Sequence, residues 1–167
     1  MIIAGTGHRP HKLNNEYEYQ GPLSKWIMDQ TREVLLAKAP ERIISGMAIG
    51  YDTMLALVAL ELKIPLLAAI PFVGQETRWP KSSRDLFNKI LSDRLTISHV
   101  VCEGGYAGWK FIKRDHYMVD NGDEVIACYN GDLQGGTWQT WKYAVQKQKP
   151  ITIINPLNYE PTLAKST

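Results

Sequence analysis

Short runs of consecutive hydrophobic residues alternate with longer segments in which hydrophobic residues recur at helical spacing. The short runs predict six β-strands, at residues 1–4, 42–45, 66–70, 98–102, 123–129 and 151–154. The longer segments predict five helices, at residues 23–39, 51–62, 80–95, 109–121 and 138–148. Because the strand runs are mostly continuous rather than alternating in polarity, we expect parallel strands covered on both faces. The pattern predicts an α/β fold: a Rossmann-like, doubly wound, mainly parallel sheet of about six strands with helices on both faces.

The length of 167 residues fits one domain. We expect a single Rossmann-like nucleotide-binding domain over residues 1–157 and a C-terminal tail over residues 158–167, which has little to bury. The longest apolar stretch is interrupted by Pro65 and Pro71, which argues against a membrane partner. Cys102 and Cys128 form no disulfide framework, so a cytoplasmic location is expected.

Candidate ligand-binding residues follow four of the predicted strands. In an open parallel sheet, ligands bind outside the carboxyl ends of the strands. Glycines there let backbone N–H groups approach a phosphate, and a following helix N-terminus adds partial positive charge. The candidates are Gly5, Thr6, Gly7, His8, Arg9, Ser45, Gly46, Met47, Ala48, Gly50, Asp52, Pro71, Gln75, Glu76, Trp79, Asn130, Gly131, Gly135, Gly136 and Thr137, together with Arg114 in the predicted helix at 109–121.

Each loop has a simpler interpretation when taken alone. A Gly-Gly-Thr sequence is often a turn with a helix cap, and Gly5-x-Gly7 lacks the third glycine of the dinucleotide fingerprint. Arg9 supplies a forked cation suited to phosphate, whereas Asp52 either accepts from ribose hydroxyls or caps its helix. Three glycine-rich loops at one sheet edge together favour a nucleotide site.

Metal and nucleic-acid partners are not favoured by the sequence. His8 and His11 have no neighbouring Cys, Asp or Glu that completes a ligand set, so no metal and no cofactor are predicted. The formal net charge is only +2, and nucleic-acid binding needs a basic track. The composition therefore argues against a nucleic-acid partner.

In order along the chain, five motifs resemble the SLOG superfamily, and its YpsA-like branch most of all. They are Gly5-Thr6-Gly7-His8-Arg9-Pro10, Ser45-Gly46-Met47-Ala48-x-Gly50-x-Asp52, Ile70-Pro71-Phe72-x-Gly74-Gln75-Glu76-x-x-Trp79, Arg114-x-x-x-Met118-Val119-Asp120 and Gly135-Gly136-Thr137. The superfamily also contains the Lonely Guy phosphoribohydrolases and the DNA-processing protein DprA. The resemblance implies a Rossmann-like fold, a nucleotide-derived ligand and a homodimer or higher homo-oligomer.

The resemblance says less about catalysis. Arg114 matches the arginine of the Lonely Guy enzymes, but Thr140 stands where they carry a catalytic glutamate. A hydroxyl cannot replace a carboxylate that stabilises an oxocarbenium-like transition state. The catalytic residues therefore stay unknown, with Arg114, Asp115 and Glu76 as candidates.

Three functions follow from the resemblance. The main prediction is a protein that binds a nucleotide-derived signal, of the cyclic-nucleotide or ADP-ribose type. It would act as a sensor, or as a phage-encoded sequestering protein in the host cytoplasm. The first alternative is an N-glycosidase acting on nucleoside monophosphates. The second is a DprA-like protein that binds single-stranded DNA.

Overall fold

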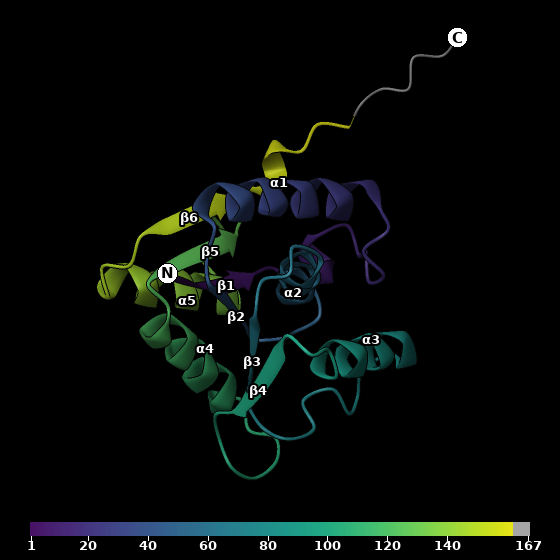
Figure 1. Ribbon diagram of the computed structural model, residues 1–167, viewed down its shortest axis with the longest axis vertical. Helices are drawn as coiled ribbons and strands as arrows, with labels where there is room; N and C mark the ends of the chain where they lie inside the picture. Colours follow the sequence, from purple (N-terminus) through teal and green to yellow (C-terminus); the bar gives the residue numbers. More distant parts are fainter. Residues whose placement is uncertain (162–167) are drawn as a thin grey trace.

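Six parallel strands form one sheet in the order β4-β3-β2-β1-β5-β6 (Figure 1). The computed structural model describes residues 1–161. The strands are β1 (Ile2–Gly7), β2 (Arg42–Ser45), β3 (Leu66–Ile70), β4 (Thr96–Val100), β5 (Glu124–Cys128) and β6 (Ile151–Ile154). The helices are α1 (Pro22–Lys38), α2 (Tyr51–Glu61), α3 (Lys81–Leu91), α4 (Trp109–Asn121) and α5 (Gly135–Gln146), with short 3-10 turns at η1 (Pro10–Lys12) and η2 (Pro156–Asn158).

The direction of strand addition reverses after β4. Strands β1 to β4 are added outward in one direction, and β5 then returns to pair with the other side of β1. Helices α1, α2 and α3 accordingly pack on one face of the sheet, whereas α4 and α5 pack on the other (Figure 1). The reversal places a topological switch point between β1 and β5, which is where open α/β sheets bind ligands.

Hydrophobic side chains fill both faces of the sheet. On β1, Ile3 belongs to the core beneath α1–α3, and the next residue, Ala4, belongs to the core beneath α4 and α5. Alternate residues of a strand point to opposite faces, so a strand with core on both sides needs a continuous hydrophobic run. The predicted fold class is therefore confirmed, and the parallel pairing explains why the runs lack alternation.

The first strand is longer than predicted. Residues 5–7 were expected to form a loop, but they pair with β5 along Gly5↔Ile126, Thr6↔Ala127 and Gly7↔Cys128. The two glycines allow α2 to approach the strand, because a Cβ at Gly7 would lie 2.5 Å from the Cβ of Tyr51. Position 7 therefore requires glycine because α2 packs closely on β1. Close approach of a phosphate is not needed to explain it.

Replacement of Gly7 by alanine tests that explanation. The new methyl group would meet the Cβ of the fully buried Tyr51, an atom that no rotamer change can move away. Overpacking of this kind costs about 1–3 kcal/mol. We expect Gly7→Ala to lower the free energy of unfolding by that amount in urea titrations. Gly108→Ala, with no atom within 4 Å of the added Cβ, is the control, and equal stability of the two variants would contradict the explanation.

Two other predicted segments shift for physical reasons. Helix α5 begins at Gly135 rather than at residue 138, since Gly135 has the positive φ of +89° that lets the chain enter the helix. Strand β4 was predicted at residues 98–102, but it spans Thr96–Val100 and lies exposed at the sheet edge. The hydrophobic run predicted a strand buried on both faces, but the side chains of β4 are largely exposed, and Ile97 is 62% exposed.

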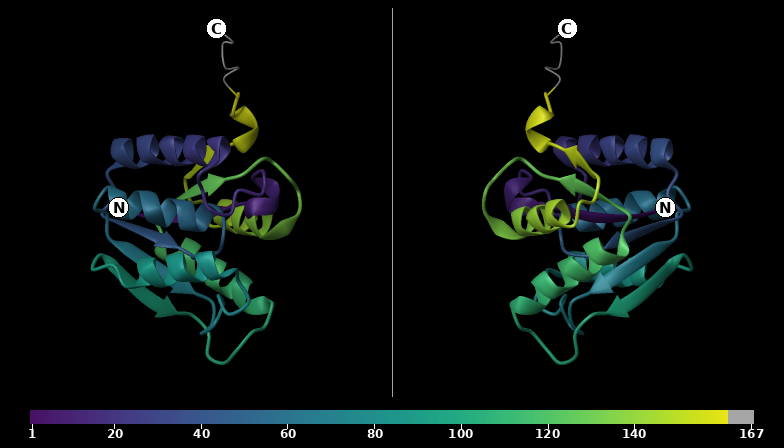
Figure 2. Two further views of the ribbon diagram at one scale, coloured as in Figure 1. Left: turned by 90° about the vertical axis from the view of Figure 1, so that its right-hand side faces the viewer. Right: turned by 90° about the vertical axis from the view of Figure 1, so that its left-hand side faces the viewer.

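The C-terminal segment begins as a packed part of the domain. Tyr159, in the predicted tail, packs against Trp26 of α1 with a centroid distance of 5.9 Å, and η2 lies beside that helix (Figure 2). The rest of the predicted tail, from residue 162, lies outside the described residues. Within residues 1–161, no helix is both long and apolar enough to cross a membrane.

Candidate functional site

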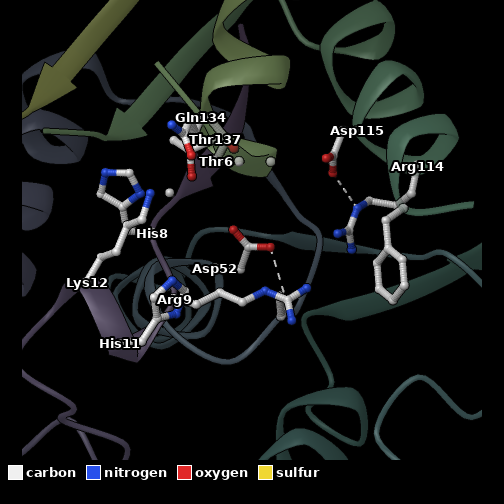
Figure 3. Close-up of a pocket in the computed structure, with 15 residues that line it drawn as sticks. Thr6, His8, Arg9, His11, Lys12, Asp52, Arg114, Asp115, Gln134 and Thr137 are labelled. Carbon is white, nitrogen blue, oxygen red and sulfur yellow. Dashed lines mark hydrogen bonds and ion pairs between the residues drawn. The ribbon is translucent and has the colours of Figure 1, made fainter. Parts of the chain in front are cut away.

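A cavity of about 160 Å³ lies at the carboxyl ends of β1 and β5 (Figure 3). Its walls come from the segment after β1, the start of α2, one turn of α4 and the first turn of α5. The lining residues are Thr6, Gly7, His8, Arg9, His11, Lys12, Ala48, Asp52, Phe111, Arg114, Asp115, Gln134, Gly135, Gly136 and Thr137. The topology thus brings together segments that are more than a hundred residues apart in the sequence.

The starts of α2 and α5 differ in how the protein uses their backbone N–H groups. At α2, the N–H of Gly50 donates to the Tyr19 hydroxyl at 2.9 Å, and the N–H of Tyr51 donates to the His8 carbonyl at 3.1 Å. At α5, the N-cap residue Gln134 makes no side-chain cap, and a Cβ built on Gly136 would meet no atom of residues 1–161 within 4 Å. The free N–H groups and the positive end of the helix dipole make the start of α5 suitable for an anion.

Arg114 forms the inner wall of the cavity and is 3% exposed. Its Nε donates to Asp115 Oδ1 at 2.6 Å, and its Nη1 donates to the carbonyls of Gly46 and, at 3.4 Å, Ala69. Gly46 permits this contact, because a Cβ there would lie 2.5 Å from Nη1 of Arg114. Arg114 therefore ties α4 to the ends of β2 and β3.

Asp52 projects into the same space from the first turn of α2 (Figure 3). Burial raises its pKa to about 6, and the neighbouring Arg114 and Arg9 oppose that rise. Its Oδ2 accepts the N–H of Ala48 at 3.3 Å. The carboxyl group thus serves the β2–α2 turn by accepting from Ala48, which precedes the helix. The predicted capping role is not seen, because the N-cap residue of α2 is Gly50 and no side chain of the described residues caps it.

His8 is buried and held by the loop after β5. Its Nε2 lies 2.8 Å from Oδ1 of Asn130 and 3.1 Å from the backbone nitrogen of the same residue. Burial lowers the pKa of His8, and the hydrogen bond to Asn130 opposes that effect. Through these contacts with Asn130, His8 positions the loop after β5.

Arg9 is the exposed cation at the mouth of the cavity. Within residues 1–161, no carboxylate oxygen lies within 4 Å of its guanidinium group, whereas Lys12 pairs with Asp132 at 2.5 Å. The guanidinium carbon lies 5.8 Å from the ring centre of Phe111. Arg9 therefore offers a forked donor without an ion-pair partner among residues 1–161, in the cavity that the start of α5 also lines.

A second, larger cavity of about 570 Å³ adjoins the first. Arg9 and Phe111 line both cavities. The remaining walls come from the segment between β3 and α3 and from the loop between β4 and α4. They are Phe72, Val73, Gly74, Gln75, Thr77, Arg78, Trp79 and Tyr106.

The structure gathers about half of the predicted site residues. Those that line the first cavity are Thr6, Gly7, His8, Arg9, Ala48, Asp52, Arg114, Asp115, Gly135, Gly136 and Thr137. Gln75 and Trp79 line the second cavity. The predicted residues that line neither are Gly5, Ser45, Gly46, Met47, Gly50, Pro71, Glu76, Asn130 and Gly131.

Several residues outside the first cavity serve the surrounding loops instead. Ser45 donates through its hydroxyl to the carbonyl of Asp52 at 2.7 Å and accepts the N–H of Met47 at 3.1 Å. A Cβ at Gly5 would lie 1.9 Å from Cδ2 of Leu55. Ser45 thus shapes its turn, because buried loops must satisfy their own polar groups. Gly5 instead leaves room for α2 to pack on β1.

Sequence reasoning missed Lys12, Phe111, Gln134 and Tyr106 as cavity residues. Phe111 had a usable signal, since it precedes Arg114 by three positions on α4 and residues so spaced share a helix face. His11 was considered only as a metal ligand. Among the residues described, no group of three or more His, Cys, Asp or Glu side chains is arranged to hold a metal ion.

The candidate catalytic groups do not form an acid–base pair aimed at one point. Asp115 and Arg114 line the first cavity but bond to each other, and Glu76 lines neither cavity. The Thr140 hydroxyl lies 3.1 Å from Oδ2 of Asp115 and 2.9 Å from the Gly136 carbonyl. The N-glycosidase hypothesis stays a prediction.

Fold and site together define a Rossmann-like domain with a cavity at its switch point. Residues 22–165 match the family described as DNA recombination-mediator protein A. The chain therefore belongs to that family, and the resemblance to the SLOG superfamily is confirmed.

Curated bacterial relatives cover most of the chain. A UPF0398 protein of Lysinibacillus sphaericus is 25% identical over 138 residues, covering 78% of this chain and 76% of the relative. A UPF0398 protein of Halalkalibacterium halodurans is 25% identical over 171 residues, covering 95% of this chain and 90% of the relative. These proteins agree with the predicted YpsA-like branch.

Two solved structures share the fold. DNA processing protein A from Streptococcus pneumoniae aligns with a TM-score of 0.67 and 21% identity over 92% of this chain. The protein of the same name from Helicobacter pylori, whose structure concerns its single-stranded DNA binding mode, aligns with a TM-score of 0.65 and 22% identity over 92% of this chain. The chain spans only 50% and 64% of those two proteins.

The family assignment corrects two predictions. The main functional prediction, a sensor or sequestering protein for a nucleotide-derived signal, is wrong, because the match is to a DNA-processing family. The argument against a nucleic-acid partner is wrong as well. The prediction used the net charge of +2, which sums the charges of the whole chain. A phosphate interacts mainly with charges within about a Debye length, so local positive charge can bind it even when the net charge is small.

Proposed function

We propose that this chain binds single-stranded DNA along the carboxyl edge of its sheet, with a backbone phosphate in the first cavity. Membership of the DNA recombination-mediator protein A family supports this proposal. So does the similarity in fold to the Helicobacter pylori protein whose structure concerns single-stranded DNA binding.

One observation carries the proposal: the uncapped start of α5 faces the cavity that the unpaired Arg9 borders. Backbone N–H groups at a helix start and a guanidinium group are the usual donors to a phosphate. The cavity measures about 160 Å³, whereas pockets for small molecules usually enclose about 300–1,000 Å³. Its size therefore suits one phosphate group of a strand that continues outside.

Fluorescence anisotropy with a labelled oligothymidylate tests the proposal. We expect salt-sensitive binding, because a single strand releases counterions when its phosphates are neutralised. Arg9→Ala is expected to weaken binding and to reduce the slope of log K against log salt by about 0.7. Gly136→Ala is expected to weaken binding at unchanged thermal stability, since its methyl group enters open space in the cavity.

Matched controls separate the site from general charge effects. Arg94→Ala removes an exposed arginine from the segment before β4, at the amino edge of the sheet. Gly108→Ala adds a methyl group that meets no side chain or distant backbone of residues 1–161 within 4 Å, and Gly108 lines neither cavity. Both controls are expected to bind like the parent protein. Absence of salt-dependent binding, or equal losses in the Arg9 and Arg94 variants, would contradict the proposal.

A further inference from the structure

Lys12 is a cation of the first cavity whose charge a nearby carboxylate neutralises. It is the last residue of η1, and it lines the cavity next to His8 (Figure 3). Its Nζ donates to Oδ2 of Asp132 at 2.5 Å. A Cβ built on Gly135 would lie 3.8 Å from the same Nζ. The ammonium group of Lys12 is therefore close to the start of α5, where the proposed phosphate binds.

The loop after β5 fixes the position of Asp132. The backbone N–H of Asp132 donates to Oδ1 of Asn130 at 2.9 Å, and its carbonyl accepts from the Tyr129 hydroxyl at 2.5 Å. Oδ1 of Asn130 also lies 2.8 Å from Nε2 of the buried His8. Side chains thus hold the backbone of Asp132 on both sides, so a defined loop presents its carboxylate to Lys12.

A competing anion can reach this ion pair. The side chains of Lys12 and Asp132 are 26% and 37% exposed. The hydrogen bond from Lys12 lowers the pKa of Asp132 below its ordinary value, so the carboxylate is ionised at neutral pH. A lysine ammonium group carries three donors on a flexible stem. Within residues 1–161, Asp132 is the one acceptor of Lys12, so Lys12 can turn to another anion without breaking other contacts.

The other two Lys and Arg side chains that residues 1–161 contribute to the cavity differ from Lys12. Arg9 has no ion-pair partner among the residues described. Arg114 is buried, and its donors hold Asp115 and two backbone carbonyls. Lys12 is both accessible and paired. It is therefore the cation whose availability to a ligand depends on a single carboxylate.

We infer that Lys12 is a further phosphate-binding residue and that Asp132 is the counter-ion that it exchanges for the strand. The inference rests on the proposed function and adds a residue pair that sets the affinity. In this exchange, the ammonium group of Lys12 turns from the Asp132 carboxylate to a phosphate oxygen. Because the contact with Asp132 is lost in return, Asp132 lowers the affinity of the site.

Removal of the Asp132 charge tests the inference. Fluorescence anisotropy with labelled oligothymidylate, repeated over a series of salt concentrations, compares Asp132→Asn with the parent protein. We expect the variant to bind about 2- to 5-fold more tightly at low salt, the range for giving up a partly exposed ion pair. The slope of log K against log salt should become steeper by about 0.7, because Lys12 then brings one uncompensated charge to the strand.

Two further variants assign the gain to Lys12. Addition of Lys12→Met to Asp132→Asn is expected to remove both the gain in affinity and the extra slope. Glu124→Gln is the matched control, because it frees Lys38 from a pair of 2.6 Å whose side chains are 31% and 21% exposed. Glu124 begins β5, at the amino edge of the sheet, so this variant should bind like the parent protein. Partly exposed ion pairs add little to stability, so all the variants should fold, which thermal melts check.

The outcomes separate the exchange from the proposed function. Unchanged or weaker binding by Asp132→Asn would overturn the exchange and leave strand binding intact. An equal gain in Glu124→Gln would also overturn it, because net charge would then explain the effect. A gain that persists in the double variant would overturn it as well, since Asp132 would then act by repulsion alone. Failure of the parent protein and every variant to bind would overturn the proposed function together with the exchange.

Discussion

Arg114→Met is expected to lower the free energy of unfolding by about 3–5 kcal/mol, the usual cost of breaking a buried ion pair from one side. The substitution leaves the Asp115 carboxylate without its 2.6 Å partner and removes the donor from the Gly46 and Ala69 carbonyls. In a domain of this size, such a loss lowers Tm by about 6–20 °C. Urea titration and scanning calorimetry both measure it.

Arg32→Met is the matched control, because Arg32 likewise pairs with a carboxylate. Its Nε and Nη2 each lie 2.9 Å from an oxygen of Glu61, but the pair is on the surface between α1 and α2. Exposed pairs contribute at most about 1 kcal/mol. If both variants lost the same stability, Arg114 would not have the structural role that its burial and hydrogen bonds indicate.

Asp52→Asn is expected to stabilise the protein at neutral pH and to have little effect in acid. Burial raises the pKa of Asp52 from 3.8 to about 6 in the folded state, so the folded protein binds this proton more tightly than the unfolded chain. The stability associated with the protonated carboxyl is complete below pH 3.8 and is lost as pH rises to about 6. That difference in pKa corresponds to about 3 kcal/mol at pH 7.

Urea titrations of both proteins at pH 4 and pH 7.5 measure this effect. The gain of Asp52→Asn over the parent protein should appear at pH 7.5 and shrink at pH 4. Asp85→Asn, on the exposed face of α3, should change stability by less than about 0.5 kcal/mol. A variant less stable than the parent at pH 7.5 would show that Arg114 and Arg9 outweigh the cost of burying the Asp52 carboxylate.

The hydrophobic pattern was sufficient for the fold because each strand and helix depends mostly on its own residues. Parallel strands with core on both faces need continuous hydrophobic runs, and the runs around Ile44 and Ile126 have that form. The boundaries were less predictable. Residues 5–7 join β1 only because β5 pairs with them and α2 packs on their glycines, and both partners are distant in sequence.

The site was predictable to the extent that topology alone determines it. Carboxyl ends of parallel strands meet at one edge, so the segment at Arg9 and the first turn of α5 at Gly136 were expected together, and both line the first cavity. The role of each glycine was not predictable, because Gly7 serves packing and Gly136 faces open space. The sequence shows where a glycine lies but not which neighbouring atoms would clash with a side chain there.

The sequence by itself determined the fold class, the edge of the sheet at which the first cavity lies and the resemblance to the SLOG superfamily. Only the tertiary structure decided which charges remain free there. It pairs Lys12 with Asp132 and Arg114 with Asp115, and it leaves Arg9 unpaired among the residues described. Among the residues described, it also leaves Oε1 of Gln75, a residue of the second cavity, without a hydrogen-bond donor. The physical reason is that electrostatic and hydrogen-bond partners are chosen by distance in space, which composition and net charge do not record.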